Sequence, residues 1–112
     1  MANTPRLSAR TRDIAEAVRA GLTRVYGPRL KAVYVYGSYA RGEAREGSDL
    51  DLLVVLSSMD DVGTELSAMS ETGSRLSLSY DVTISLLPVT EEEFRERRTP
   101  LLLNVRREAV PV

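Results

Sequence analysis

The chain contains no cysteine, no histidine and no tryptophan among its 112 residues. Without cysteine it forms no disulfide bond and has neither a thiolate nucleophile nor a cysteine-based zinc site. Without histidine it lacks the side chain that most often exchanges protons near neutral pH. Any acid–base chemistry or metal binding is therefore expected to depend on carboxylates.

An excess of charge of one sign is also missing, because 15 basic residues against 16 acidic residues leave a net charge of −1. Such a balance creates no general field that would hold the phosphates of long nucleic acids, so we do not expect an enzyme acting on extended DNA or RNA. No apolar run is long enough to span a bilayer, and no signal-peptide pattern is present. We therefore expect a cytoplasmic protein without membrane association.

The length and the hydrophobic content of 43% predict one domain with a single core, spanning residues 1–112. Residues 1–6 are expected to be flexible. Apolar periodicity, Gly27-Pro28 and Pro100 divide the rest into elements. The predicted helices span residues 8–26, 60–78 and 90–98, with a break before 101–107, and the predicted strands span residues 30–36, 50–56 and 80–87.

These elements predict an α+β fold with a small mixed sheet of strand order 1-2-3 packed against helices. The first two strands should be antiparallel, and a right-handed crossover through the 60–78 helix should make the third parallel to the second. Alternation along the second strand points Leu50, Leu52, Val54 and Leu56 toward the helices. Leu53 and Val55 then lie on the other face, where either the chain's own termini or a partner must cover them.

The most informative segment lies between the first two strands. Gly37 has no Cβ to block a close approach of phosphate, and Ser38 adds a hydroxyl at the start of a helical turn. Asp49 and Asp51 lie two residues apart, so both carboxylates leave the same side of the strand and can share one or two magnesium ions. This combination predicts binding of a nucleoside triphosphate with metal.

Two further residues of this segment are candidates for nucleotide binding. Arg41, three residues after Ser38, either reaches a phosphate of the nucleotide or pairs on the surface with Glu43 or Glu46. Ser48 either bonds the backbone where the second strand begins or touches a phosphate.

The motif GSYARG at 37–42 is followed by SDLDLLV at 48–54, with ten residues between Ser38 and Asp49. This pattern resembles the DNA polymerase β-like nucleotidyltransferase superfamily. The closest resemblance is to its minimal nucleotidyltransferases, which are often found beside a HEPN partner. The resemblance implies magnesium-dependent transfer of a nucleoside monophosphate, AMP from ATP, onto a hydroxyl acceptor with loss of pyrophosphate. It also implies a third carboxylate on the third strand, for which Asp81 is the candidate metal ligand and proton acceptor.

The acceptor stays open at this stage. In related enzymes a further domain usually holds the acceptor, and we expect no such domain here, so the resemblance favours an antitoxin that binds and nucleotidylates a HEPN-type toxin. One alternative is a module that binds nucleotide or partner without turnover. Another is an adenylyltransferase for small molecules, built as a homodimer.

Overall fold

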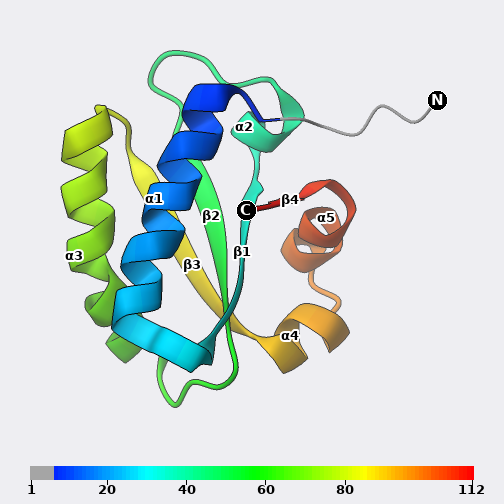
Figure 1. The fold of residues 1–112 in the computed structure, drawn as a ribbon. Helices are drawn as coiled ribbons and strands as arrows, with labels where there is room; N and C mark the ends of the chain where they lie inside the picture. Colours follow the sequence, from blue (N-terminus) through cyan, green and yellow to red (C-terminus); the bar gives the residue numbers. More distant parts are fainter. Residues whose placement is uncertain (1–6) are drawn as a thin grey trace.

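The computed structural model describes residues 7–112, so the predicted flexibility of residues 1–6 lies outside the described part of the chain. It is an α+β fold whose sheet is covered by helices on both faces (Figure 1). The helices are α1 (Ala9–Tyr26), η1 (Gly27–Arg29), α2 (Ser38–Arg41), α3 (Val62–Tyr80), α4 (Glu91–Glu96) and α5 (Pro100–Glu108). The strands are β1 (Leu30–Tyr36), β2 (Leu50–Leu56), β3 (Ile84–Thr90) and β4 (Val110–Pro111).

The sheet has the order β3-β2-β1-β4, which confirms the predicted order of the first three strands and adds a short fourth strand at the β1 edge. Strands β1 and β2 are antiparallel, with Tyr36 opposite Asp51. Strands β2 and β3 are parallel, with Asp51 opposite Ser85. As predicted, the end of β1 and the start of β2 therefore lie next to each other, at one end of the strands.

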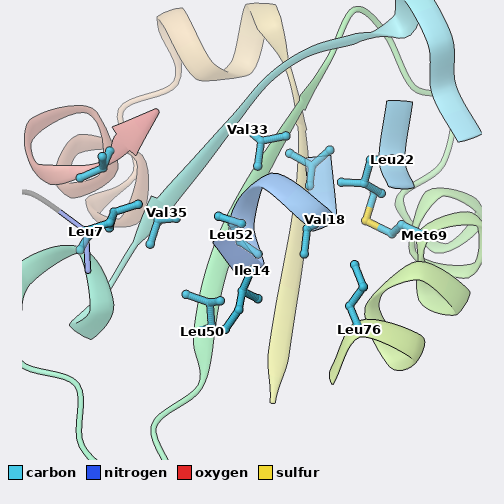
Figure 2. Close-up of a cluster of buried hydrophobic side chains, with 14 of the residues drawn as sticks. Leu7, Ile14, Val18, Leu22, Val33, Val35, Leu50, Leu52, Met69 and Leu76 are labelled. Carbon is cyan, nitrogen blue, oxygen red and sulfur yellow. The ribbon is translucent and has the colours of Figure 1, made fainter. Parts of the chain in front are cut away.

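Helices α1 and α3 lie side by side on one face of the sheet (Figure 1). The side chain of Ser8 caps α1 by accepting a hydrogen bond from the Thr11 backbone N–H at 3.1 Å. The apolar stripe of α1 packs against alternate residues of β1 and β2, as Figure 2 shows for Ile14, Val18 and Leu52. This cluster forms the larger core, and it holds the strand ends at fixed positions relative to each other.

Two of the predicted helical stripes are shorter than expected at one end. Val25 is 46% exposed, and Tyr26 takes its place in the core at 6% exposure. In α3, Met69 and Leu76 are buried, whereas Val62 and Leu66 are 45% and 42% exposed. The apolar periodicity of both helices therefore continues past the residues that the core covers.

The second face of the sheet is covered by the C-terminal part of the chain itself. Leu53 and Val55 are 0% and 3% exposed and form a second cluster with Val89 of β3 and with Leu102 and Val105 of α5. Of the two alternatives left open by the sequence, cover by this chain's own C-terminal helices is therefore the one observed. No partner is required to bury these two side chains.

The C-terminal helices begin where the sequence predicts. Thr90 and Glu93 form a capping box, in which the Thr90 hydroxyl accepts from the Glu93 backbone N–H at 3.1 Å and the Glu93 carboxylate accepts from the Thr90 backbone N–H at 3.1 Å. Pro100 is the first residue of α5, capped by Thr99, so the predicted break at Pro100 is confirmed. Within residues 7–112, no helix combines the length and apolar character needed to cross a membrane.

Candidate active site

Gly37 directly follows β1 and precedes α2, in a conformation that only glycine adopts at low cost, with φ at 75°. A Cβ atom placed on Gly37 would lie 2.6 Å from Oδ2 of Asp51, which is closer than any real contact. The glycine is therefore required twice, once by the turn of the backbone and once by the carboxylate that packs on it. The predicted proximity of Gly37 and the Asp51 carboxylate is observed in this geometry.

Asp51 lies in β2 on the same side of the strand as Leu53, facing the layer of C-terminal helices, and Asp49 precedes it by two residues. The Asp51 side chain is half-buried, whereas Asp49 is exposed. Burial, and next the charge of Asp49, raise the pKa of the Asp51 carboxyl above its ordinary value, while Arg41 acts in the opposite direction. Two carboxylates held together in this way are suited to a divalent cation.

The predicted third carboxylate is not where the sequence placed it. Asp81 was expected at the start of β3 beside Asp51, but α3 continues to Tyr80 and Asp81 forms its C-cap, with φ at 52°. The Asp81 backbone N–H donates to the Ser77 carbonyl, and β3 starts only at Ile84. Aspartate is among the few non-glycine residues that adopt this left-handed conformation, which explains how the helix absorbs Asp81.

The strand position beside Asp51 is occupied by Ser85. Ser85 is exposed and lies on the face of the sheet that carries Asp51. Throughout residues 7–112, no three acidic side chains are gathered closely enough to hold a metal ion. The structure thus brings Asp49 and Asp51 together and leaves Asp81 outside this pair.

Arg41 takes the surface pairing that the sequence left open. Its Nε donates to Glu43 at 2.7 Å, and its Nη1 donates to Glu108 of α5 at 3.2 Å. Both ion pairs are partly exposed, and pairs of that kind are weak enough to be exchanged for a phosphate group. The side chain stays close enough to Asp51 to affect the pKa of that carboxyl.

Ser48 bonds the backbone, which is one of its two predicted roles. Its hydroxyl accepts from the Arg45 backbone N–H at 2.9 Å, and its own backbone N–H donates to the Arg45 carbonyl at 2.9 Å. These bonds close the loop that leads into β2. Ser38, the other predicted hydroxyl, is the first residue of α2 and is half-buried directly after Gly37.

Sequence reasoning missed three residues at this site. Tyr36 lies opposite Asp51 across the β1–β2 pair, and its pKa is raised by burial and, to a smaller extent, by Asp51. Glu108 reaches Arg41 from the far end of the chain, and no local pattern announces that contact. Ser85 lies within the predicted third strand, but only the register identifies it as the neighbour of Asp51.

A glycine-serine turn and two carboxylates meet where β1 ends and β2 begins, in the middle of a mixed sheet. Such an arrangement is suited to proteins that bind phosphate groups with a divalent cation. The profile of the nucleotidyltransferase domain matches residues 15–109. This chain belongs to the nucleotidyltransferase domain family.

Two proteins of Methanocaldococcus jannaschii are similar to this chain in sequence. One is 36% identical over 84 residues, which cover 75% of this chain and 77% of the relative. The other is 33% identical over 73 residues, which cover 65% of this chain and 73% of the relative. Both are provisionally named protein adenylyltransferases.

Two solved structures are similar in fold and sequence. One, provisionally assigned as a minimal nucleotidyltransferase, has a TM-score of 0.61 and 33% identity, with 90% of this chain and 91% of that chain covered. The other is a crystal structure of a toxin-antitoxin with AMP-PNP, with a TM-score of 0.61 and 25% identity, covering 86% and 70% of the two chains. The fold class and the family that the sequence predicted are confirmed.

Proposed function

We propose that this protein transfers AMP from ATP, in the presence of Mg²⁺, to a hydroxyl group of a protein partner. The observation that carries the proposal is the packing of the Asp51 carboxylate on Gly37, with Asp49 two residues away on the same side of the chain. The similarity to two provisionally named protein adenylyltransferases supports a protein as the acceptor. The similarity to a toxin-antitoxin with AMP-PNP supports an adenine nucleotide as the donor.

The residues at the site fit a magnesium ion. Asp49 and Asp51 are hard oxygen donors. Burial and, second, the charge of Asp49 raise the pKa of Asp51, and a cation bound between the two carboxylates would offset both effects. With no third carboxylate near the pair, the triphosphate is expected to provide the remaining oxygen ligands. When bound, the metal would neutralise negative charge on the phosphates during transfer, and one or two ions satisfy this requirement.

The protein groups hold and orient the reactants. Gly37 and Ser38 leave the backbone open to the phosphates, and Arg41 exchanges its ion pairs with Glu43 and Glu108 for a phosphate oxygen. The acceptor oxygen bonds to the α-phosphorus, the bond from that phosphorus to the bridging oxygen of the β-phosphate breaks, and pyrophosphate leaves. The proton of the hydroxyl passes to a carboxylate, because the sequence contains no histidine or cysteine to take it.

We propose that the hydroxyl acceptor belongs to a HEPN-type toxin. This is the partner that the resemblance of the 37–54 motif implies. The alternative of a module that binds nucleotide or partner without turnover is favoured by one observation. Ser85, and not a carboxylate, stands beside Asp51, so the pair lacks the third acidic group that the superfamily pattern implies. A measurement of turnover distinguishes AMP transfer from binding without turnover.

The direct experiment mixes the protein with the helical protein encoded beside it, ATP and Mg²⁺, and follows the partner by mass spectrometry. We expect added AMP units on a Tyr, Ser or Thr hydroxyl, and no addition with Asp49→Asn. If the partner gains no mass and binds wild type and Asp49→Asn equally well, the binding module is the correct reading. Rapid modification of a small alcohol by the protein alone would contradict both readings that involve a partner.

A further inference from the structure

Helix α3 carries a row of exposed residues spaced four apart. Val62, Leu66 and Leu78 are 45%, 42% and 86% exposed, and the same spacing places the exposed Ser70 and Ser74 between the two leucines. Residues four apart form one ridge on the surface of a helix. We call these five residues the α3 ridge. Three of the six large apolar side chains exposed within residues 7–112 lie on it, so the ridge is a candidate contact surface.

The α3 ridge borders an apolar groove of about 580 Å³ between α3 and β3. Met69 of α3 and Ile84 and Leu86 of β3 line the groove together with the ridge, and none of the lining residues carries a charge. Strand β3 is the last strand of the sheet on this side, and α3 and β3 lie at one border of the molecule (Figure 1). The groove is therefore open to another molecule.

The outer edge of β3 is closed to an added strand. The register turns the backbone groups of alternate residues outward, and these residues are Ile84, Leu86, Pro88 and Thr90. The Ile84 N–H donates to the Ser77 hydroxyl and the Thr90 N–H donates to the Glu93 carboxylate, each at 3.1 Å, and proline has no N–H. Three of the four outward positions thus offer no free donor, so a partner is expected to contact side chains instead of extending the sheet.

The α3 ridge is complementary to a second copy of itself. A two-fold interface brings residue i of one copy against residue j of the other, and j against i. When two α3 helices pack antiparallel about the level of residue 72, Leu66 meets Leu78 of the other copy at both ends of the contact, and Ser70 meets Ser74 on either side of its centre. Ridges of residues four apart interlock in the commonest class of helix packing, and small central side chains allow a close approach.

The charges beside the α3 ridge favour the antiparallel arrangement over a parallel one. Glu71 and Arg75 are exposed and lie 3.5 Å apart within one copy. In the antiparallel arrangement, Glu71 of one copy lies within about 3 Å, measured along the helix axis, of Arg75 of the other. Parallel packing about a two-fold axis would instead place each charge at the level of its own like charge, which is unfavourable.

We propose that the protein forms a two-fold homodimer through the α3 ridge and the adjoining groove. Contact between Leu66 of one copy and Leu78 of the other removes from water two apolar side chains that the single chain leaves exposed. The proposal is independent of AMP transfer, because none of Gly37, Asp49 and Asp51 lines the groove.

Sedimentation velocity over a range of protein concentrations measures the dimer. We expect the wild-type protein to dimerise, and we expect Leu66→Glu and Leu78→Glu each to raise the Kd of the dimer by more than about tenfold, because each substitution places a charge in the interface twice. Leu103→Glu is the matched control, since Leu103 is 45% exposed but lies on α5, and it should leave the Kd unchanged. Thermal unfolding of the three variants checks that each is folded.

Disulfide trapping tests the arrangement of the two helices, because the chain has no cysteine of its own. Ser70→Cys, mixed with isotopically labelled Ser74→Cys and oxidised, should yield the mixed disulfide in excess of the share that random pairing gives. The proposal is overturned if wild type stays a monomer up to roughly 1 mM, if both leucine variants dimerise as wild type does, or if the disulfides join like positions. A monomeric wild type that binds the helical protein encoded beside it, with loss of that binding in both leucine variants, would assign the surface to that protein instead.

Discussion

The two ends of the sheet each carry a buried or half-buried carboxylate, and the two differ in their neighbours. Glu65, 6% exposed, lies 2.7 Å from Arg29 and accepts from it. Asp51, at the end where β2 begins, has another carboxylate as its near neighbour and a pKa raised by burial and by that neighbour. The fold itself explains the paired carboxylate of Glu65, whereas Asp51, beside a second carboxylate, is the group on which the proposed metal site rests.

The same contrast extends to the arginines. Arg29 is held by Glu65 and stacks over the Tyr26 ring at 5.4 Å, so its position is fixed by side chains of the protein. Arg41 is shared between two partly exposed glutamates and is therefore easier to release. The ion pair at the Arg29 end is held in place by neighbouring side chains, and the Arg41 end is the one to which the proposed function assigns the substrate.

The largest effects are expected when one carboxylate at each end of the sheet, Asp51 or Glu65, is replaced by its neutral amide. Asp51→Asn should reduce AMP transfer by more than about 100-fold, because even indirect loss of support for a metal ligand costs 10–100-fold. Glu65→Gln should keep transfer and lose about 1–3 kcal/mol of unfolding free energy, since it removes the charged acceptor of Arg29. Labelling assays measure AMP transfer, and urea unfolding measures the unfolding free energy of each variant. Equal activity losses would contradict the division of roles.

Gly37 and Gly42 are compared in the second test. Both have positive φ, at 75° and 73°, but ψ is −154° at Gly37 and 22° at Gly42. A Cβ on Gly42 meets nothing within 4 Å, whereas one on Gly37 meets Asp51. Gly42→Ala should lose about 1 kcal/mol to backbone strain, and Gly37→Ala should lose more, about 3 kcal/mol, because its conformation is adopted almost only by glycine. Gly37→Ala alone should also abolish transfer, as measured by labelling. Full activity in Gly37→Ala would show that the position of Asp51 is not critical.

Ser85→Asp adds a carboxylate at the position beside Asp51. If the pair is short of one ligand, this variant should bind Mg²⁺ about tenfold more tightly without nucleotide, because affinity follows the number of ligand charges. Calorimetric titration with Mg²⁺ measures the change, and Ser85→Asn serves as the neutral control. A gain in both variants, or in neither, would indicate that the register position is unrelated to the metal.

The smallest expected effect is on stability as a function of pH. Because the folded-state pKa of Asp51 is raised, ionisation is harder in the folded than in the unfolded protein. Ionised Asp51 therefore lowers stability as pH rises through its unfolded and then its folded pKa, and the cost persists at neutral pH. Without metal, Asp51→Asn should be more stable than wild type at pH 7, by about 1 kcal/mol or less, and equal to it below the ordinary pKa of aspartate. Thermal unfolding at the two pH values checks this sign.

The sequence predicted the bounds of β1 and β2 correctly, but it did not predict the start of β3 or the docking of α5. The strands β1 and β2 begin and end as expected, because their apolar runs are bounded by Gly37 and by Asp49. Antiparallel pairing then forces Gly37 and Asp51 together. The start of β3 was misplaced, since the alternation of Asp81, Thr83 and Ser85 is compatible with a strand or with a helix cap followed by one. The contact of Glu108 with Arg41 depends on the docking of α5, which no local pattern encodes.

The central claim is that the Asp49–Asp51 pair binds a cation together with the triphosphate, and thermal unfolding with each ligand tests it most directly. The account predicts that ATP with Mg²⁺ raises the Tm by more than the sum of the shifts from ATP alone and Mg²⁺ alone. It also predicts that Asp51→Asn loses this excess while Glu65→Gln keeps it. Equal shifts by ATP with and without Mg²⁺ in the wild-type protein would contradict the account.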